Sequence, residues 1–322
     1  MPRIAIRMEG ANIAEVRGRG SRENPSDQNL DEYIAGTDIV ERKIAEFPDG
    51  KAYQKKVTDM KRLTEIDHKM QLHTPLDASE LVFLYEIDSP IQGFGYSRDP
   101  RIKELRSQRN PEEDMPIVFA CEPSQIARSP SEIKPGVRAY VGPLVPGIFT
   151  RLTEATVEHI YTSFPERKIQ IQQFEIGKKN KKQLEDALNQ AGGFVSSQAK
   201  VYIDLDFHYF PFLQRNVVHT VEAKFQDLGI DDWTLLMDAG EAVDRLGLEL
   251  CPIEVALQYS LKFSNRPVND IVAIPVKHNA SKLRPIYSVQ RESEGVSLSA
   301  YWPKYFHLMN ASDKVVFLLS KK

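Results

Sequence analysis

The chain has 322 residues, of which 41% are hydrophobic and 27% charged, and its formal net charge is −3. These values are ordinary for a soluble globular protein, and the length predicts one large or two ordinary domains. The balanced charge excludes a global field that would draw the protein onto nucleic acid or an anionic membrane. No apolar run approaches the roughly 20 residues needed to span a bilayer. Only two cysteines occur, Cys121 and Cys251, which is typical of a reducing compartment. We therefore expect a cytoplasmic protein without a membrane partner.

Hydrophobic periodicity predicts an α+β protein with two domains. The first, residues 1–195, is expected to be a helix-rich, mixed α+β domain. Apolar residues at helical spacing predict helices near 40–47, 53–70, 153–164 and 181–191. Alternating or continuous apolar runs predict strands at 4–8, 81–87, 117–121, 139–144 and 168–176. In the last of these, the apolar phase slips between Ile171 and Phe174, which predicts a β-bulge at Gln172-Gln173.

The second domain, residues 196–322, is expected to hold a mainly antiparallel sheet with one packed helix. Residues 217–226 alternate as a strand, and residues 232–246 follow as an amphipathic helix closed by Gly247. From Ile253 to Phe263 the apolar residues show a period of two. Pro252 suits a strand entrance and a helix start equally, and we favour a strand. Short apolar runs separated by turn residues predict further strands at 271–276, 284–290, 296–301 and 314–319.

One group of polar residues in the second domain suggests metal-dependent chemistry. Metal-dependent nucleases of the PD-(D/E)xK type need an acidic residue on one strand and an acid-x-Lys pair on the next. Two carboxylates hold a divalent cation there, and the lysine stabilises charge or positions the attacking water. Asp206 followed by Glu222 and Lys224 fits this spacing, with Asp206 and Glu222 as metal ligands and Lys224 as the catalytic residue. The cofactor would be Mg²⁺ or Mn²⁺.

A weaker pattern is typical of ADP-ribosyl transferases, which use an arginine, a Ser-Thr-Ser-like strand and a (Q/E)xE pair. The matching residues are Arg98, Thr162-Ser163 and Gln173-Phe174-Glu175, although the gap between Ser163 and Glu175 is short. The arginines of segment 17–22 could contact phosphate, and the lysines of segment 178–182 could form an interaction patch, but solvated charge explains both segments more simply. Aromatic residues cluster at 207–212 and 301–306, where core packing is a simpler explanation than base stacking.

The run Gly247-Leu248-Glu249-Leu250-Cys251-Pro252, continuing through Glu254-Val255, resembles the C-terminal domain of an uncharacterised bacterial protein family. Those domains also end in a Val-Phe-x-Leu run, as at 316–319 here. The resemblance covers about the last hundred residues. It implies a bacterial setting and assigns no catalytic residues. Our leading interpretation is therefore a cytoplasmic binding or interaction protein; its partner stays open, and a protein and a nucleic acid are both options. The sequence leaves open whether the protein is an enzyme, with the metal-dependent nuclease or phosphodiesterase and the transferase as alternatives.

Overall fold

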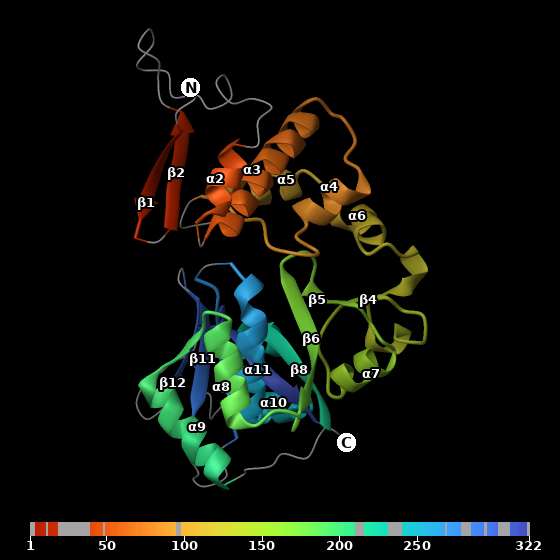
Figure 1. Ribbon diagram of the computed structural model, residues 1–322. Coiled ribbons are helices and arrows are strands. Elements are labelled where there is room, and N and C mark those ends of the chain that lie inside the picture. Colours follow the sequence, from red (N-terminus) through yellow and green to blue (C-terminus); the bar gives the residue numbers. More distant parts are fainter. Residues whose placement is uncertain are drawn as a thin grey trace. The chain divides into compact units, whose positions relative to one another are not determined.

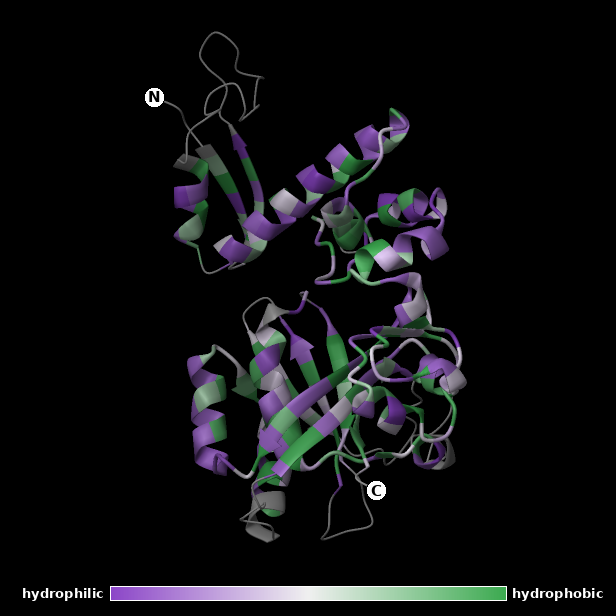
Figure 2. Cartoon of the chain, turned by 90° about the vertical axis from the view of Figure 1, so that its right-hand side faces the viewer, coloured by the Kyte–Doolittle hydropathy of each residue, from purple (hydrophilic) through white to green (hydrophobic). Residues whose placement is uncertain are grey.

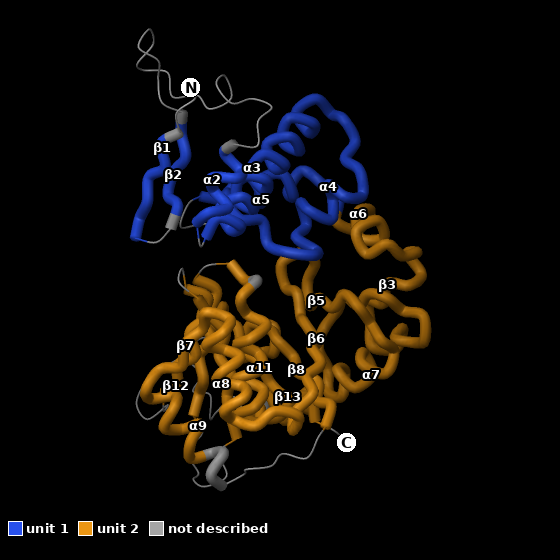
Figure 3. Tube along the Cα trace, viewed as in Figure 1, with its two compact units in different colours: residues 1–110 blue, residues 111–322 orange. Residues whose placement is uncertain are grey.

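The computed structural model describes residues 4–10, 12–18, 39–47, 49–94, 98–209, 216–230, 240–267, 269–277, 285–292, 295–301 and 310–320. The chain divides into two compact units, residues 1–110 and residues 111–322 (Figure 3). Within the described residues, no helix is both long and apolar enough to cross a membrane. Each unit has its own buried core and is described by itself.

Unit 1 combines a β-hairpin with four described helices (Figure 1). The elements are β1 (Ile4–Glu9), β2 (Asn12–Gly18), α2 (Ile39–Ala45), α3 (Gly50–Gln71), α4 (Ala78–Leu84) and α5 (Pro100–Ser107). The expected strand at 4–8 and the helices near 40–47 and 53–70 are confirmed. The strand expected at 81–87 is wrong, because residues 81–84 belong to α4 and residues 85–87 lie in the turn after it. The start of α4 is fixed by a capping box. The Asp77 side chain accepts from the backbone N–H of Glu80, and the Glu80 side chain accepts from the backbone N–H of Asp77.

Unit 2 is built on one large mixed sheet of eleven described strands. Ten lie in the order β3-β4-β5-β6-β8-β13-β10-β11-β12-β7, and β9 pairs with β13 off this path. Neighbouring strands pair antiparallel except at β3-β4, β4-β5, β13-β10 and β12-β7. The strands are β3 (Ile126–Ala127), β4 (Ala139–Val141), β5 (His159–Ser163), β6 (Arg167–Ile176), β7 (Phe194–Val195), β8 (Asn216–Lys224), β9 (Leu248–Glu249), β10 (Ile271–Pro275), β11 (Ile286–Arg291), β12 (Val296–Tyr301) and β13 (Lys314–Leu319).

Helices cover both faces of this sheet (Figure 1). One core packs α8 (Lys181–Gln190), α9 (Ser197–Tyr209) and α11 (Ile253–Lys262) against one face. The other core packs α7 (Ile148–Glu154) and α10 (Gly240–Arg245) against the opposite face. Short segments complete the unit: α6 (Pro111–Val118) and the 3-10 turns η1 (Pro123–Gln125), η2 (Pro130–Glu132), η3 (Phe225–Leu228) and η4 (Phe263–Asn265).

The α+β class is confirmed, and the sheet is larger than expected. It takes in β3 to β7 from residues 126–195, so the expected boundary between 195 and 196 falls inside unit 2. The antiparallel pairing of β6 with β8 crosses that boundary. The strands expected at 139–144 and 168–176 and the four near the C-terminal end are confirmed, as is the helix at 181–191. Of the helix expected at 232–246, the structure describes residues 240–246. Residues 240–245 form α10, and Leu246 lies in the turn after it.

Three other expectations for unit 2 are wrong. Residues 117–121 lie at the end of α6 and the turn after it, not on a strand. The helix expected at 153–164 is instead the end of α7 followed by β5. Thr156, with a φ of 55°, separates the two, and this left-handed backbone cannot continue a helix.

The segment from Ile253 to Lys262 is an α-helix, so the strand prediction there is wrong. Pro252 is its N-cap, and seven of the ten residues of α11 are buried, including Glu254. The backbone N–H of Gly177 donates to both Glu254 oxygens at 3.0 and 2.9 Å, which ties the helix start to the turn after β6. Its polar residues Glu254, Gln258 and Lys262 are spaced four apart and share one side of the helix, but the apolar residues are so many that they also recur at every second position.

Strand β6 changes character along its length without a bulge. Its register with β8 is continuous from Gln170 to Ile176, so the bulge predicted at Gln172-Gln173 is absent from this pairing. Ile169 and Ile171 pack on the α7 face, whereas Phe174 and Ile176 pack on the α11 face. Gln170 and Gln172 therefore lie on the α11 face too, because alternate residues share a face. Figure 2 shows such hydrophilic stretches beside apolar ones along the strands of unit 2.

Candidate functional site

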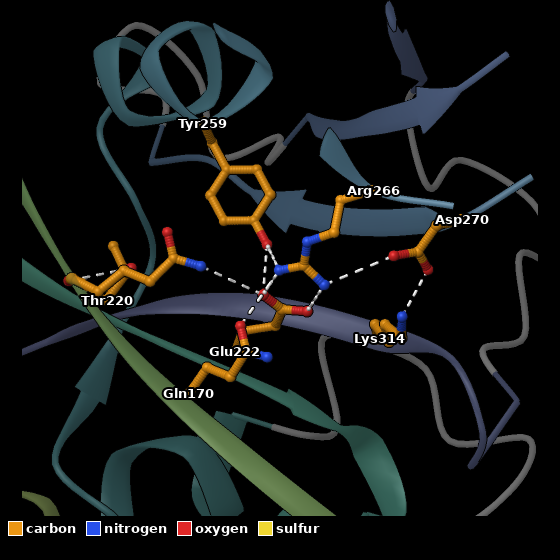
Figure 4. A network of polar contacts seen from close by, with 8 residues as sticks. Gln170, Thr220, Glu222, Tyr259, Arg266, Asp270 and Lys314 are labelled. Carbon is orange, nitrogen blue, oxygen red and sulfur yellow. Dashed lines mark hydrogen bonds and ion pairs between the residues drawn. The ribbon is translucent and has the colours of Figure 1, made fainter. Parts of the chain in front are cut away.

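Glu222 on β8 is the centre of a polar network on the α11 face of the sheet (Figure 4). Its cross-strand partner on β6 is Gln170. Only 5% of Glu222 is exposed. A buried carboxylate is strongly disfavoured unless it is paired and hydrogen-bonded. The surrounding side chains supply both kinds of contact.

Arg266, directly after η4, neutralises this carboxylate with a two-pronged ion pair. Its Nη1 lies 3.0 Å from Glu222 Oε1, and its Nη2 lies 2.6 Å from Oε2. The same Nη2 donates to Gln170 Oε1 at 3.2 Å. Burial lowers the pKa of Arg266, but the negative charge of Glu222 outweighs this and the pKa is raised. Arg266 is therefore a permanent cation.

Tyr259 on α11 completes the contacts of Glu222. Its hydroxyl lies 2.5 Å from Glu222 Oε2, and Gln172 Nε2 donates to the same oxygen at 3.5 Å. Burial and the adjacent Glu222 charge raise the pKa of Tyr259 well above its usual value. The phenol therefore stays protonated and donates to the carboxylate. Glu222 is closed in by donors from α11, β6 and the turn after η4.

Toward the end of the strands the network reaches solvent through Asp270 and Lys314. Asp270 stands just before β10 and contacts two cations, Lys314 Nζ at 2.5 Å and Arg266 Nη1 at 3.5 Å. Its side chain is 10% exposed, whereas that of Lys314, the first residue of β13, is 34% exposed. The network thus runs from a buried carboxylate to a solvent-accessible ammonium group.

Two lysines stand directly opposite each other at this end of the sheet. Lys224 on β8 is the register partner of Lys314 on β13, so both side chains lie on the α11 face. Like charges directly opposite on neighbouring strands destabilise a sheet. Asp270 compensates Lys314, but Lys224 forms no ion pair with any described residue. In the described part of this network, Lys224, Lys314 and Arg266 outnumber the carboxylates of Glu222 and Asp270 by one.

A second buried carboxylate, Asp227 in η3, lies near Lys224. Its Oδ1 accepts from Thr162 Oγ1 at 3.4 Å and lies 3.6 Å from Arg167 Nε, while its buried Oδ2 has no hydrogen-bond partner. Burial raises the pKa of Asp227, against the opposing effects of Arg167 and Lys224. Asp227 is thus a third carboxylate near this end of the sheet, and it is shared between Arg167 and Lys224.

Two of the three residues predicted for the metal site lie on one strand, and the third lies on a helix. Glu222 and Lys224 share a face of β8, as predicted from the alternation of the strand. Asp206 lies in helix α9 and not on a strand, and its side chain is outside the described residues. Among the residues that the structure describes, no three His, Cys, Asp or Glu side chains are grouped to hold a metal ion. Both oxygens of Glu222 already accept from Arg266, so this carboxylate is not available as a ligand for a metal ion.

Of the residues proposed for the transferase, Arg98 belongs to unit 1, and the others lie apart within unit 2. Thr162 and Ser163 are on a strand, β5, and not at a helix end as expected. Ser163 pairs with Arg167, however, and Glu175 stands eight residues further along β6. At about 3.3 Å per residue this separates Ser163 from Glu175 by roughly 26 Å. Glu175 instead pairs with Lys178. The geometry brings no transferase site together here.

Several candidates from the sequence fall outside the described residues. These are the loop from residue 19 onward, the side chains of 207–209, and residues 210–212 and 302–306. In the basic segment 178–182, Lys181 forms an ion pair with Asp204 on α9, so part of that charge stabilises the packing of two helices.

Sequence reasoning missed Arg266, Tyr259 and Asp270. Arg266 belongs to none of the elements predicted above, and Tyr259 appeared as an apolar position of the mispredicted strand. The sequence feature that could have indicated a polar partner is the slip in the apolar phase of β6, between Ile171 and Phe174. Two glutamines on a face that is otherwise buried indicate a polar partner above them, because buried polar groups are hydrogen-bonded.

No known family model matches the sequence, and neither a curated protein nor a solved structure matches the chain. The function is therefore argued from the site alone.

Proposed function

We propose that unit 2 is a binding module that recognises a phosphate-bearing ligand at the end of its sheet, between Lys224 and Lys314. The observation that carries this proposal is the register, which sets two lysine side chains opposite each other on the same face. A pair of this kind destabilises the free protein and is relieved when an anion bridges the two ammonium groups.

The charges around the pair support an anionic ligand. Glu222 is already neutralised by Arg266, and Asp270 offsets one further cation. The excess positive charge lies where the strands end and where Lys314 is accessible. A phosphate offers several acceptor oxygens, so one group can contact both lysines. This agrees with the sequence interpretation of a binding protein without assigned catalysis.

The test is the binding of pyrophosphate to the full chain, measured by calorimetry at low salt. We expect saturable binding that weakens as the salt concentration rises. Lys224→Gln and Lys314→Gln should each weaken it by about fivefold, which corresponds to roughly 1 kcal/mol for one charged hydrogen bond. Lys200→Gln is the matched control, because Lys200 is an exposed lysine on α9 and should leave binding unchanged.

A single-stranded oligonucleotide serves as the second arm of this experiment. If it binds through the same lysines and pyrophosphate does not, the ligand is a nucleic acid and recognition depends on more than a phosphate group. If neither probe binds, or if Lys200→Gln weakens binding as much as Lys224→Gln does, the proposal is rejected.

A further inference from the structure

Asp270 occupies the position in which an anionic ligand would contact Lys314 and Arg266. Its carboxylate lies 2.5 Å from Lys314 Nζ and 3.5 Å from Arg266 Nη1, so it already bridges two of the three cations of the site. The contact to Arg266 is long for a charged hydrogen bond, whereas Arg266 lies 2.6 and 3.0 Å from the Glu222 oxygens. Arg266 therefore does not depend on Asp270 for its position.

The backbone around Asp270 is anchored independently of this side chain. Asn269 N–H donates to Arg291 O at 2.7 Å, Arg291 N–H donates to Asp270 O at 2.9 Å, and Asp270 N–H donates to Pro267 O at 3.1 Å. Asn269 itself is held at a φ of 69°, a conformation that persists only where its surroundings fix it. The carboxylate can therefore leave the two cations by side-chain rotation while the turn stays in place.

We propose that Asp270 is an internal anion that a ligand must displace, and that the ligand is consequently a terminal, dianionic phosphate. This inference rests on the proposed function. A carboxylate or a phosphodiester carries one negative charge, as Asp270 does, and competes against a group already held within the chain. A phosphomonoester carries between 1.5 and 2 negative charges near pH 7. It can contact Lys224 as well as the two cations that Asp270 leaves.

The experiment compares phenyl phosphate, dimethyl phosphate and acetate as probes, at one pH near 7.5 and one salt concentration. For the unaltered protein we expect phenyl phosphate to bind at least about tenfold more tightly than dimethyl phosphate, with acetate weaker still. Equal binding of phenyl phosphate and dimethyl phosphate would overturn the inference without any variant. Failure of the protein to bind phenyl phosphate and pyrophosphate alike would instead reject the proposed function.

Asp270→Asn tests the displacement directly, because asparagine keeps the size of the side chain and removes its charge. We expect this variant to bind phenyl phosphate about tenfold more tightly. Glu249→Gln is the control for net charge, since Glu249 is exposed and pairs with Leu318 at the other end of β13 from Lys314. It should change the affinity by less than about twofold. Unchanged or weaker binding by Asp270→Asn would show that Asp270 supports the site and would overturn the inference.

Discussion

The hydroxyl of Tyr259 lies 2.5 Å from Glu222 Oε2, and both side chains are buried between helix α11 and strand β8. This contact joins the helix to the sheet at the point where the sheet carries a charge. Together with Arg266 it explains how a carboxylate is kept in the interior, and it makes the stability of unit 2 sensitive to single substitutions.

Arg266→Met should strongly destabilise the protein, because it leaves the charge of Glu222 buried without a cation. Breaking a buried ion pair costs about 3–5 kcal/mol, and we expect the lower end because the Arg266 side chain is 20% exposed. The free energy of unfolding in urea is the measurement. The double variant Glu222→Gln, Arg266→Met should recover most of the loss. A single variant as stable as the unaltered protein would contradict the pairing described here.

Tyr259→Phe should lower the free energy of unfolding by about 1–3 kcal/mol, the range for a hydrogen bond to a charged group. The ring remains in place, so the loss measures the hydroxyl alone. Tyr140→Phe is a suitable comparison, since the hydroxyl of Tyr140 donates to a neutral acceptor, the backbone carbonyl of Pro143, at 2.6 Å. Equal losses in the two variants would show that the short contact to Glu222 has no special weight.

Asp227 should make stability fall as the pH rises through its native pKa. Burial raises that pKa above the usual value of 3.8, so the native state holds the proton more tightly than the unfolded state. The resulting stabilisation is complete below 3.8 and is lost as the pH passes the raised value. Asp227→Asn should flatten this part of the curve of melting temperature against pH. It should be at least as stable as the unaltered protein at pH 7. An unchanged curve would assign the pH dependence to other groups.

Millimolar Mn²⁺ or Mg²⁺ should not raise the melting temperature through Glu222, because Arg266 already occupies both oxygens of this carboxylate. A ligand that binds only the native state raises the melting temperature, so thermal shifts report such binding. Glu222→Gln should therefore respond to the metal as the unaltered protein does. A clear Mn²⁺ shift that disappears in this variant would revive the metal-dependent nuclease.

Much of the strand content was predictable, because β10 to β13 show apolar runs bounded by turn residues. Helix α11 was not, since its apolar face is so wide that apolar residues also recur at every second position from Ile253 to Phe263. Helix α4 was predictable in principle from Asp77 and Glu80, whose spacing is that of a capping box. A local apolar run outweighed this signal in our interpretation.

For the site, the alternation of β8 placed Glu222 and Lys224 on one face. It could not show that α11 lies over that face or that Arg266, 44 residues later, meets Glu222. The opposition of Lys224 and Lys314 depends on a register between strands that are 90 residues apart, counting from 224 to 314. Pairings at such separation leave no periodic trace in either segment, so the charge balance of the site appears only in three dimensions.

The position of β13 has a consequence for how unit 2 is assembled during synthesis. This strand is formed by residues 314–319, yet it lies between β8 and β10 and joins the two halves of the described sheet. Because β13 is synthesised after every other described strand, the edges of β8 and β10 that pair with it are unpaired until it leaves the ribosome. Such edges invite aggregation. Unit 2 should therefore depend on chaperones more during translation than a sheet whose central strands are made first.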